Sequence, residues 1–205
     1  MNWYSSDPHA FHNKVIKYQH RPFKDVVEMT ECIAKNINSV VNKRKDKLYV
    51  LGDWSFGPRH SPKKQLENAT KFRDMIDCER VYLVFGNHDH LKDEDQYGAF
   101  SRDFKRLFTK CDHVMEIWDE VVGGKIFLSH YSHRVWNASH HGRPALYGHS
   151  HGSLADDPTS LAFDVGVDCF NYFPICSKQV KDILDRKYDW IMKMYGPNFF
   201  TRKVD

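Results

Sequence analysis

The residues best able to do chemistry in this sequence follow apolar stretches, and the segment VFGNHDH (84–90) is the densest of them. It passes through Gly86 into Asn87, His88 and Asp89, which carry an amide, an imidazole and a carboxylate. Because these groups bind divalent cations or exchange protons, the segment indicates a catalytic or metal site.

Four other segments set carboxylates or imidazoles directly after a predicted strand. In open α/β sheets, ligand sites form beyond the carboxyl ends of the strands, so five strand ends can deliver side chains to one cleft. Glycine precedes three of these groups, which permits a sharp turn of the backbone there. The polar groups at these strand ends are Asp7, His9, Asp53, Asn87, His88, Asp89, His130, His149 and His151.

This set of carboxylates, imidazoles and an amide oxygen suits divalent transition metals. It contains more ligands than one tetrahedral ion uses, which predicts two ions about 3.5–4 Å apart. We expect manganese, with iron, zinc or nickel as alternatives. The five cysteines form no CxxC pair, so a zinc-thiolate site is not expected.

The elements that must position these residues alternate between strand and helix in the first half of the chain. Strands then dominate the second half, which predicts a layered α/β sandwich with more antiparallel pairing there. No linker or repeat interrupts the chain, so we expect a single domain over 1–205. Strands are predicted at 1–6, 47–51, 80–85, 113–118, 125–129, 144–147 and 161–167, and helices at 24–42, from Ser61-Pro62, at 97–108 and after Ser177.

The composition of the chain favours a cytoplasmic protein. The chain has 205 residues, 41% of them hydrophobic, and no run of the roughly 20 apolar residues that a membrane span needs. We recognise no signal peptide at the N-terminus. The cysteines are odd in number and scattered along the chain, which predicts reduced thiols. The net charge of +3 is too modest to predict stable nucleic-acid binding.

Five motifs together resemble those of the calcineurin-like metallophosphoesterases, especially the small bacterial and phage members of that superfamily. The likeness extends from Trp3 to about Lys187, and it implies a four-layer α/β/β/α sandwich and a metal-dependent phosphoesterase. The motifs are SDPHAFH (6–12), LGDWSFG (51–57), FGNHDH (85–90), LSHYSHRVW (128–136) and YGHSHG (147–152).

The resemblance also implies a role for each matching residue. His88 should lie beside the metals without binding either, and Asp89 should orient the His88 imidazole through a hydrogen bond. Asp53 should bridge the two ions. The first ion should be held by Asp7, His9 and His151, and the second by Asn87, His130 and His149.

The expected reaction is hydrolysis of a phosphate ester by a hydroxide that bridges the two ions. His88 would protonate the leaving oxygen, and Asn87 would offset charge on the phosphoryl oxygens. His12, Arg21 and Arg134 are further candidates for binding the phosphate, although a surface role suits the two arginines nearly as well.

The expected substrate is a small phosphodiester, a nucleotide or a phosphomonoester. One alternative is a nuclease that acts on DNA or RNA ends, although the short chain and modest charge argue against it. The other is a metal-free binding or scaffold module on the same fold, for which broken ligand positions would be expected. The sequence leaves the oligomeric state open.

Overall fold

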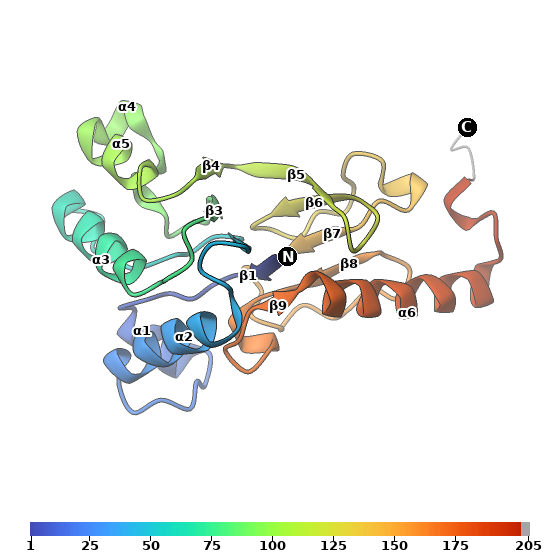
Figure 1. Cartoon of the computed structure of the whole chain (residues 1–205), viewed down its shortest axis with the longest axis horizontal. Coiled ribbons are helices and arrows are strands. Elements are labelled where there is room, and N and C mark those ends of the chain that lie inside the picture. Colours follow the sequence, from blue (N-terminus) through green and yellow to red (C-terminus); the bar gives the residue numbers. More distant parts are fainter. Residues whose placement is uncertain (202–205) are drawn as a thin grey trace.

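The computed structural model describes residues 1–201 and contains two sheets that face each other (Figure 1). The first sheet has the order β4-β3-β2-β1-β9, and the second has the order β5-β6-β7-β8. The strands of the first sheet are β1 (Asn2–Ser5), β2 (Lys47–Val50), β3 (Val81–Val84), β4 (Lys110–Asp112) and β9 (Ile175–Cys176). Those of the second are β5 (Val114–Asp119), β6 (Gly124–Ser129), β7 (Ala145–Tyr147) and β8 (Ala162–Asp164).

The pairing within the sheets decides where the strand ends lie. Strands β1 to β4 run parallel, so their carboxyl ends share one edge, while β9 pairs with β1 in the antiparallel sense. In the second sheet β6, β7 and β8 are parallel, and β5 is antiparallel to β6.

Helices flank the two sheets, which confirms the predicted α/β sandwich. They are α1 (Asn13–Tyr18), α2 (Val26–Val40), α3 (Pro62–Asp74), α4 (Glu94–Tyr97), α5 (Ala99–Lys105) and α6 (Ser177–Tyr195). Short 3₁₀ turns are η1 (His90–Lys92), η2 (Ser139–His141), η3 (Val167–Cys169) and η4 (Phe199–Thr201). Within residues 1–201, none of the helices combines the length and the apolar content that crossing a bilayer requires.

Alternation along the strands divides the core into two main parts. Leu48 and Val50 of β2 face α2, α3 and α5, where Ile33 and Phe72 are buried. Tyr49, between them, faces the second sheet and α6. This period of two is the one expected for a sheet covered on both faces.

The outer face of the second sheet is covered by a loop, whereas helices cover the outer face of the first sheet. Trp136, from the segment between β6 and β7, packs there against Phe127, Ala145 and Tyr147. Its indole N–H donates to the carbonyl of Arg143 at 2.9 Å. A loop with the short turn η2 therefore covers part of this face in place of a long helix.

Helix boundaries follow local chemistry. The Ser61 hydroxyl caps α3, and Pro62 begins it, as the sequence predicts. The helix predicted over 97–108 is interrupted at Gly98, whose φ of 51° and ψ of −117° lie outside the helical region. Predictions missed α1, β4 and β9, and α6 extends further along the chain than expected.

Asp119 joins three elements around one buried carboxylate. It is 1% exposed and accepts hydrogen bonds from Tyr4 Oη at 2.5 Å, Ser177 Oγ at 2.6 Å and Asn2 Nδ2 at 3.0 Å. Burial alone would raise the pKa of Asp119, but the hydrogen bonds from Ser177 and Tyr4 hold it below its ordinary value. The carboxylate thus ties β1 and α6 to the turn after β5.

Replacing Asp119 by alanine should destabilise the protein by about 2–4 kcal/mol, because several buried donors lose their acceptor. For a domain of this size, that corresponds to a fall in melting temperature of roughly 5–15 °C. Asp103→Ala is the control, since Asp103 pairs with Arg106 at the surface and should contribute less than about 0.5 kcal/mol. Equal melting temperatures for the two variants would contradict this role for Asp119.

Candidate metal centre

The predicted ligands lie on loops that leave the strand ends and meet between the two sheets. Main-chain contacts fasten these loops together. The Asp7 N–H donates to the carbonyl of Gly52 at 3.1 Å, and the His9 N–H donates to that of Asp53 at 2.9 Å. The His149 N–H donates to the Asp7 carboxylate at 2.8 Å, although the two residues are 142 positions apart.

Five of the seven predicted ligands have left-handed backbone conformations. This region costs an ordinary L-residue roughly 1–2 kcal/mol, and such residues cluster at functional sites. The surrounding hydrogen bonds must therefore hold these loops against their intrinsic preference. The φ values are 57° for Asp7, 48° for His9, 55° for Asp53, 66° for His149 and 49° for His151.

Two glycines permit the loops to approach closely. A Cβ atom on Gly86 would collide with the Asp53 carboxylate. One on Gly148 would collide with the Ser6 hydroxyl and the Asp7 carboxylate. The glycines that precede the ligands are thus needed for space as well as for turning the chain.

The first ligand group consists of Asp7, His9 and His151, whose ligand atoms lie within 4.8 Å of one another. Asp7 Oδ1 is 3.8 Å from His9 Nε2 and 3.9 Å from His151 Nε2. The other imidazole nitrogen of His151, Nδ1, lies 2.6 Å from the Asp168 carboxylate. That contact directs Nε2 toward Asp7, as carboxylate partners of metal-binding histidines do.

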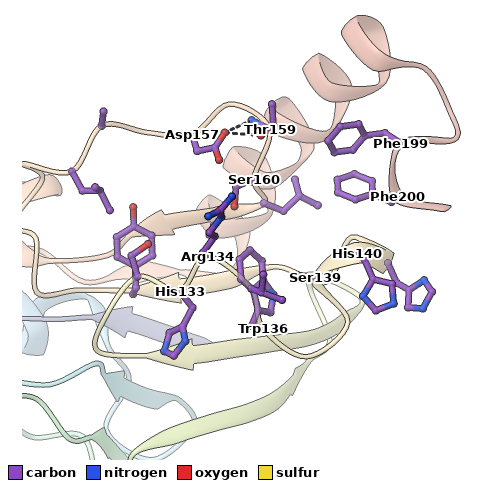
Figure 2. A pocket seen from close by; sticks show the side chains of 18 residues that line it. His133, Arg134, Trp136, Ser139, His140, Asp157, Thr159, Ser160, Phe199 and Phe200 are labelled. Atoms are coloured by element: carbon purple, nitrogen blue, oxygen red, sulfur yellow. Dashed lines mark hydrogen bonds between the residues drawn. The ribbon is translucent and has the colours of Figure 1, made fainter. Parts of the chain in front are cut away.

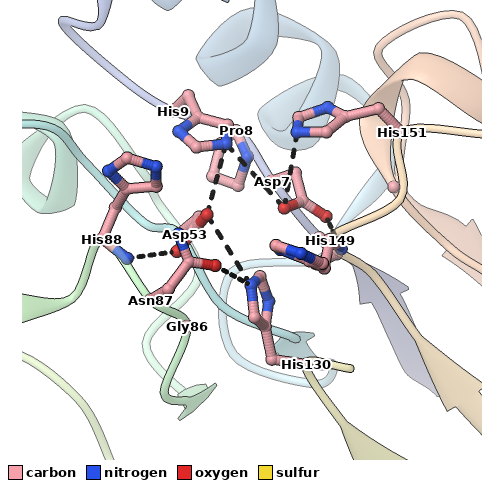
Figure 3. A network of polar contacts seen from close by, with 12 residues as sticks. Asp7, Pro8, His9, Asp53, Gly86, Asn87, His88, His130, His149 and His151 are labelled. Carbon is pink, nitrogen blue, oxygen red and sulfur yellow. Dashed lines mark hydrogen bonds and ion pairs between the residues drawn. The ribbon is translucent and has the colours of Figure 1, made fainter. Parts of the chain in front are cut away.

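In the second ligand group, the ligand atoms of His130, His149 and Asp53 lie within 4.8 Å of one another, and Asn87 lies beside them (Figure 3). His130 Nε2 lies 3.0 Å from Asn87 Oδ1 and 3.7 Å from Asp53 Oδ2. Asp53 Oδ2 is also 3.3 Å from His9 Nε2, so this single oxygen faces both groups.

The donor set fits divalent cations. Asp7 Oδ1 is buried and has no hydrogen-bond partner, which is costly for a carboxylate unless a cation neutralises it. Burial raises the pKa of Asp7 to about 7, and burial with the neighbouring Asp89 and Asp7 raises that of Asp53. Burial lowers the pKa of His130 to about 4, which keeps its imidazole neutral and able to bind metal.

His88 and Asp89 differ from the predicted arrangement in one respect. The His88 ring lies 5.1 Å from that of His9, so the structure places it at the site, where burial and the nearby Arg59 lower its pKa. Asp89 does not contact the His88 imidazole, whose Nδ1 is buried without a partner. The Asp89 carboxylate instead accepts three main-chain N–H groups, those of Asp53, Trp54 and Gly86.

The three other candidates for phosphate binding lie in different surroundings. His12 is 8% exposed and stacks on Phe56 with ring centroids 4.0 Å apart, close to His88. The Arg21 guanidinium is fully buried beneath the first ligand group, which does not favour contact with substrate. Arg134 is exposed and lines a cleft of about 1120 Å³ beside Trp136; no predicted ligand is among its lining residues (Figure 2).

Sequence reasoning missed two contributors to the site. The Tyr131 hydroxyl lies 3.5 Å from Asn87 Oδ1. Its position directly after His130 in the sequence could have indicated that it lies at the site. The supporting role of Arg21 cannot be recognised from the sequence around it, because its hydrogen-bond partner Asp168 is 147 residues away. Two further carboxylates support this region: Asp168 contacts His151 Nδ1, and Asp164 accepts the main-chain N–H groups of Gly152 and Gly166.

Without divalent ions, ionisation of Asp7 should lower the stability of the protein as the pH rises from 6.5 to 8. Asp7 stabilises the folded state fully below its unfolded pKa of 3.8, and this contribution is lost as the pH rises through about 7. The buried histidines act in the opposite direction, and part of their contribution still develops just above pH 6.5, so the loss from Asp7 is judged against a variant without that carboxylate. The gap between melting temperatures in MnCl₂ and in EDTA should therefore widen with pH.

The control for this effect is Asp7→Asn, which has no carboxylate to ionise at this position. Its melting temperature in EDTA should fall less between pH 6.5 and 8 than that of the wild type. A gap that stays constant or narrows in the wild type would contradict the proposed neutralisation of Asp7 by a cation.

Comparison with known proteins agrees with this geometry. The chain is 27% identical over 186 residues to an uncharacterised protein of Methanocaldococcus jannaschii, covering 88% of this chain and 89% of that one. A crystal structure of an Aquifex aeolicus protein of unknown function shares the fold, with a TM-score of 0.60 at 20% identity, over 89% of this chain and 98% of that one. The family described as calcineurin-like phosphoesterase matches residues 3–168, and the chain belongs to that family.

Proposed function

We propose that the protein hydrolyses small phosphate esters with two divalent cations, manganese being the expected metal. The observation that carries this proposal is the convergence of ligand atoms from five separated segments, with Asp53 shared between the two groups. Family membership supports a metal-dependent phosphoesterase in general.

The residues of the two groups would hold one cation each, with Asp53 between them. When bound, such a pair of ions lowers the pKa of a water that attacks phosphorus and offsets charge on the phosphoryl oxygens. The chain orients the ligands for this. His130 Nδ1 lies 2.7 Å from the carbonyl of Leu51, and a neutral imidazole that donates there keeps the lone pair of Nε2 free to bind metal.

His88 is proposed to stabilise or protonate the leaving oxygen. Burial and Arg59 lower its pKa, so the imidazolium is the minor form near neutral pH and the neutral ring would act as an N–H donor. Its main-chain N–H donates to Asp53 Oδ1 at 2.7 Å, which fixes its position relative to the shared carboxylate. Its imidazole is half-buried among the rings of His9, His12 and Phe56, without a hydrogen bond at Nδ1. Because Nδ1 is buried, the ring nitrogen that would face a substrate is Nε2.

The substrate class is proposed from the surroundings of His88. The stacked rings of His12 and Phe56 offer one aromatic face beside the ligands, and Asn87 offers an amide for a phosphoryl oxygen. A small phosphodiester, nucleotide or phosphomonoester could bind against this face without further contacts from other parts of the protein. The proposed activity therefore includes hydrolysis of bis-p-nitrophenyl phosphate as an artificial diester.

Replacing His88 by alanine should leave the bound metals in place and lower kcat by about 10²–10⁴-fold for esters of poor leaving groups. The loss should be smaller for p-nitrophenyl esters, because p-nitrophenolate needs little protonation. His60→Ala is the matched control, since His60 is an exposed histidine outside both ligand groups and should affect kcat less than threefold. An equal loss for good and poor leaving groups would exclude the proton-donor role.

A comparison of substrates tests the proposed size limit. Under identical manganese concentrations, kcat/KM should be highest for small nucleotide diesters or monoesters, and lower for a single-stranded oligonucleotide or a phosphopeptide. A preference of more than tenfold for the oligonucleotide or phosphopeptide, about 1.4 kcal/mol of transition-state binding, would contradict the small-ester proposal.

A further inference from the structure

Arg21 is a buried cation whose hydrogen-bonding capacity is fully used. Its guanidinium is 0% exposed. Nε donates to Asp168 Oδ1 at 2.8 Å, and Nη2 donates to Asp168 Oδ2 at 2.7 Å and to the carbonyl of Asp7 at 2.9 Å. Nη1 donates to the carbonyl of Pro8 at 3.1 Å and lies 3.4 Å from the sulfur of Met29. All five N–H donors of the side chain thus have acceptors, and none remains for a phosphate.

The first consequence concerns the Asp7–His9 turn. Asp7 and His9 both have left-handed backbones, and Pro8 between them has no N–H to donate. The N–H groups of Asp7 and His9 are satisfied by the loop after β2. Arg21 takes the carbonyls of Asp7 and Pro8, so one guanidinium holds the opposite side of this strained turn.

The second consequence concerns His151. Asp168 receives two hydrogen bonds from Arg21 and offers the same Oδ2 to His151 Nδ1. The carboxylate is therefore fixed as an acceptor that directs His151 Nε2 toward Asp7.

The second ligand group is held differently. Asp89 fastens the loop that leads to Asn87, but among residues 1–201 no charged side chain outside the ligands hydrogen-bonds the histidines of this group. His130 is oriented by the carbonyl of Leu51, and His149 is exposed. None of the hydrogen bonds from Arg21 reaches Asn87, His130 or His149 among residues 1–201. The two groups thus differ in how firmly the protein holds them before any ion binds.

We propose that Arg21 is a positioning residue for the first metal site alone, where it holds the Asp7–His9 turn directly and His151 through Asp168. Its effect is to make the two metal affinities unequal, with the Asp7–His9–His151 site the tighter one. The proposal rests on the metal assignment of the proposed function, and it goes beyond that function in assigning the order in which the ions bind.

The test measures manganese binding by calorimetry and by electron paramagnetic resonance, with no assay of turnover. His149→Ala weakens the second site and isolates the first, and His151→Ala does the converse. In the His149→Ala background, Arg21→Gln should weaken manganese binding by about 10–100-fold, the usual effect of losing such a supporting partner. In the His151→Ala background, the same change should alter the remaining affinity less than threefold.

Two further variants separate positioning from general stability. Arg73→Gln is the matched control, because Arg73 also donates to three main-chain carbonyls, those of Leu107, Ile76 and Cys78, away from the ligands. It should lower the melting temperature and leave both affinities unchanged. Asp168→Asn should weaken the first site as Arg21→Gln does, and it keeps the proposal testable if the Arg21 variant does not fold.

The outcomes distinguish this inference from the proposed function. Equal weakening in both backgrounds, no weakening in either, or the same weakening by Arg73→Gln would overturn the inference while leaving the metal centre intact. A wild-type protein that binds no manganese, cobalt or zinc would instead overturn the proposed function.

Discussion

The structure depends on keeping the carboxylates of Asp7 and Asp53 buried at the meeting point of the two sheets. They are 0% and 1% exposed, and Asp7 Oδ1 has no hydrogen-bond partner. Two buried carboxylates repel each other and lose their hydration, so each must bind a proton or face a cation. Burial lowers the pKa values of His9 and His130, so these two imidazoles do not supply that positive charge. The site therefore fits divalent cations better than it fits a polar core.

The surrounding fold meets this constraint mainly through its main chain. Asp89, itself buried, accepts the N–H groups of Gly86, Asp53 and Trp54 and so fastens the loop after β3 to the loop after β2. Arg21 does the same for the turn after β1. Charged side chains are thus used beneath the site to hold loops in place, and the left-handed conformations of the ligands are the cost of that arrangement.

The side chains that meet at the site could be predicted from sequence because each follows a strand that its own apolar pattern reveals, as His130 follows 125–129. The role of Asp89 could not be predicted from sequence. Whether its carboxylate accepts from the neighbouring imidazole or from three main-chain N–H groups depends on how two distant loops meet. Arg21 was read as a phosphate contact for the same reason: its acceptor Asp168 is 147 residues away. Strand β9, only two residues long, has no periodicity to detect.

Asp53 also links the proposed acid to the metal groups. One of its oxygens, Oδ1, accepts the main-chain N–H of His88, while the other faces His9 and His130. A displacement of this carboxylate would therefore move the main chain at His88 together with the shared ligand atom. Since Asp89 leaves the His88 imidazole unbonded, the position of that ring follows from this anchor and from packing against neighbouring rings. The geometry of proton donation and that of metal binding are thus set by one side chain.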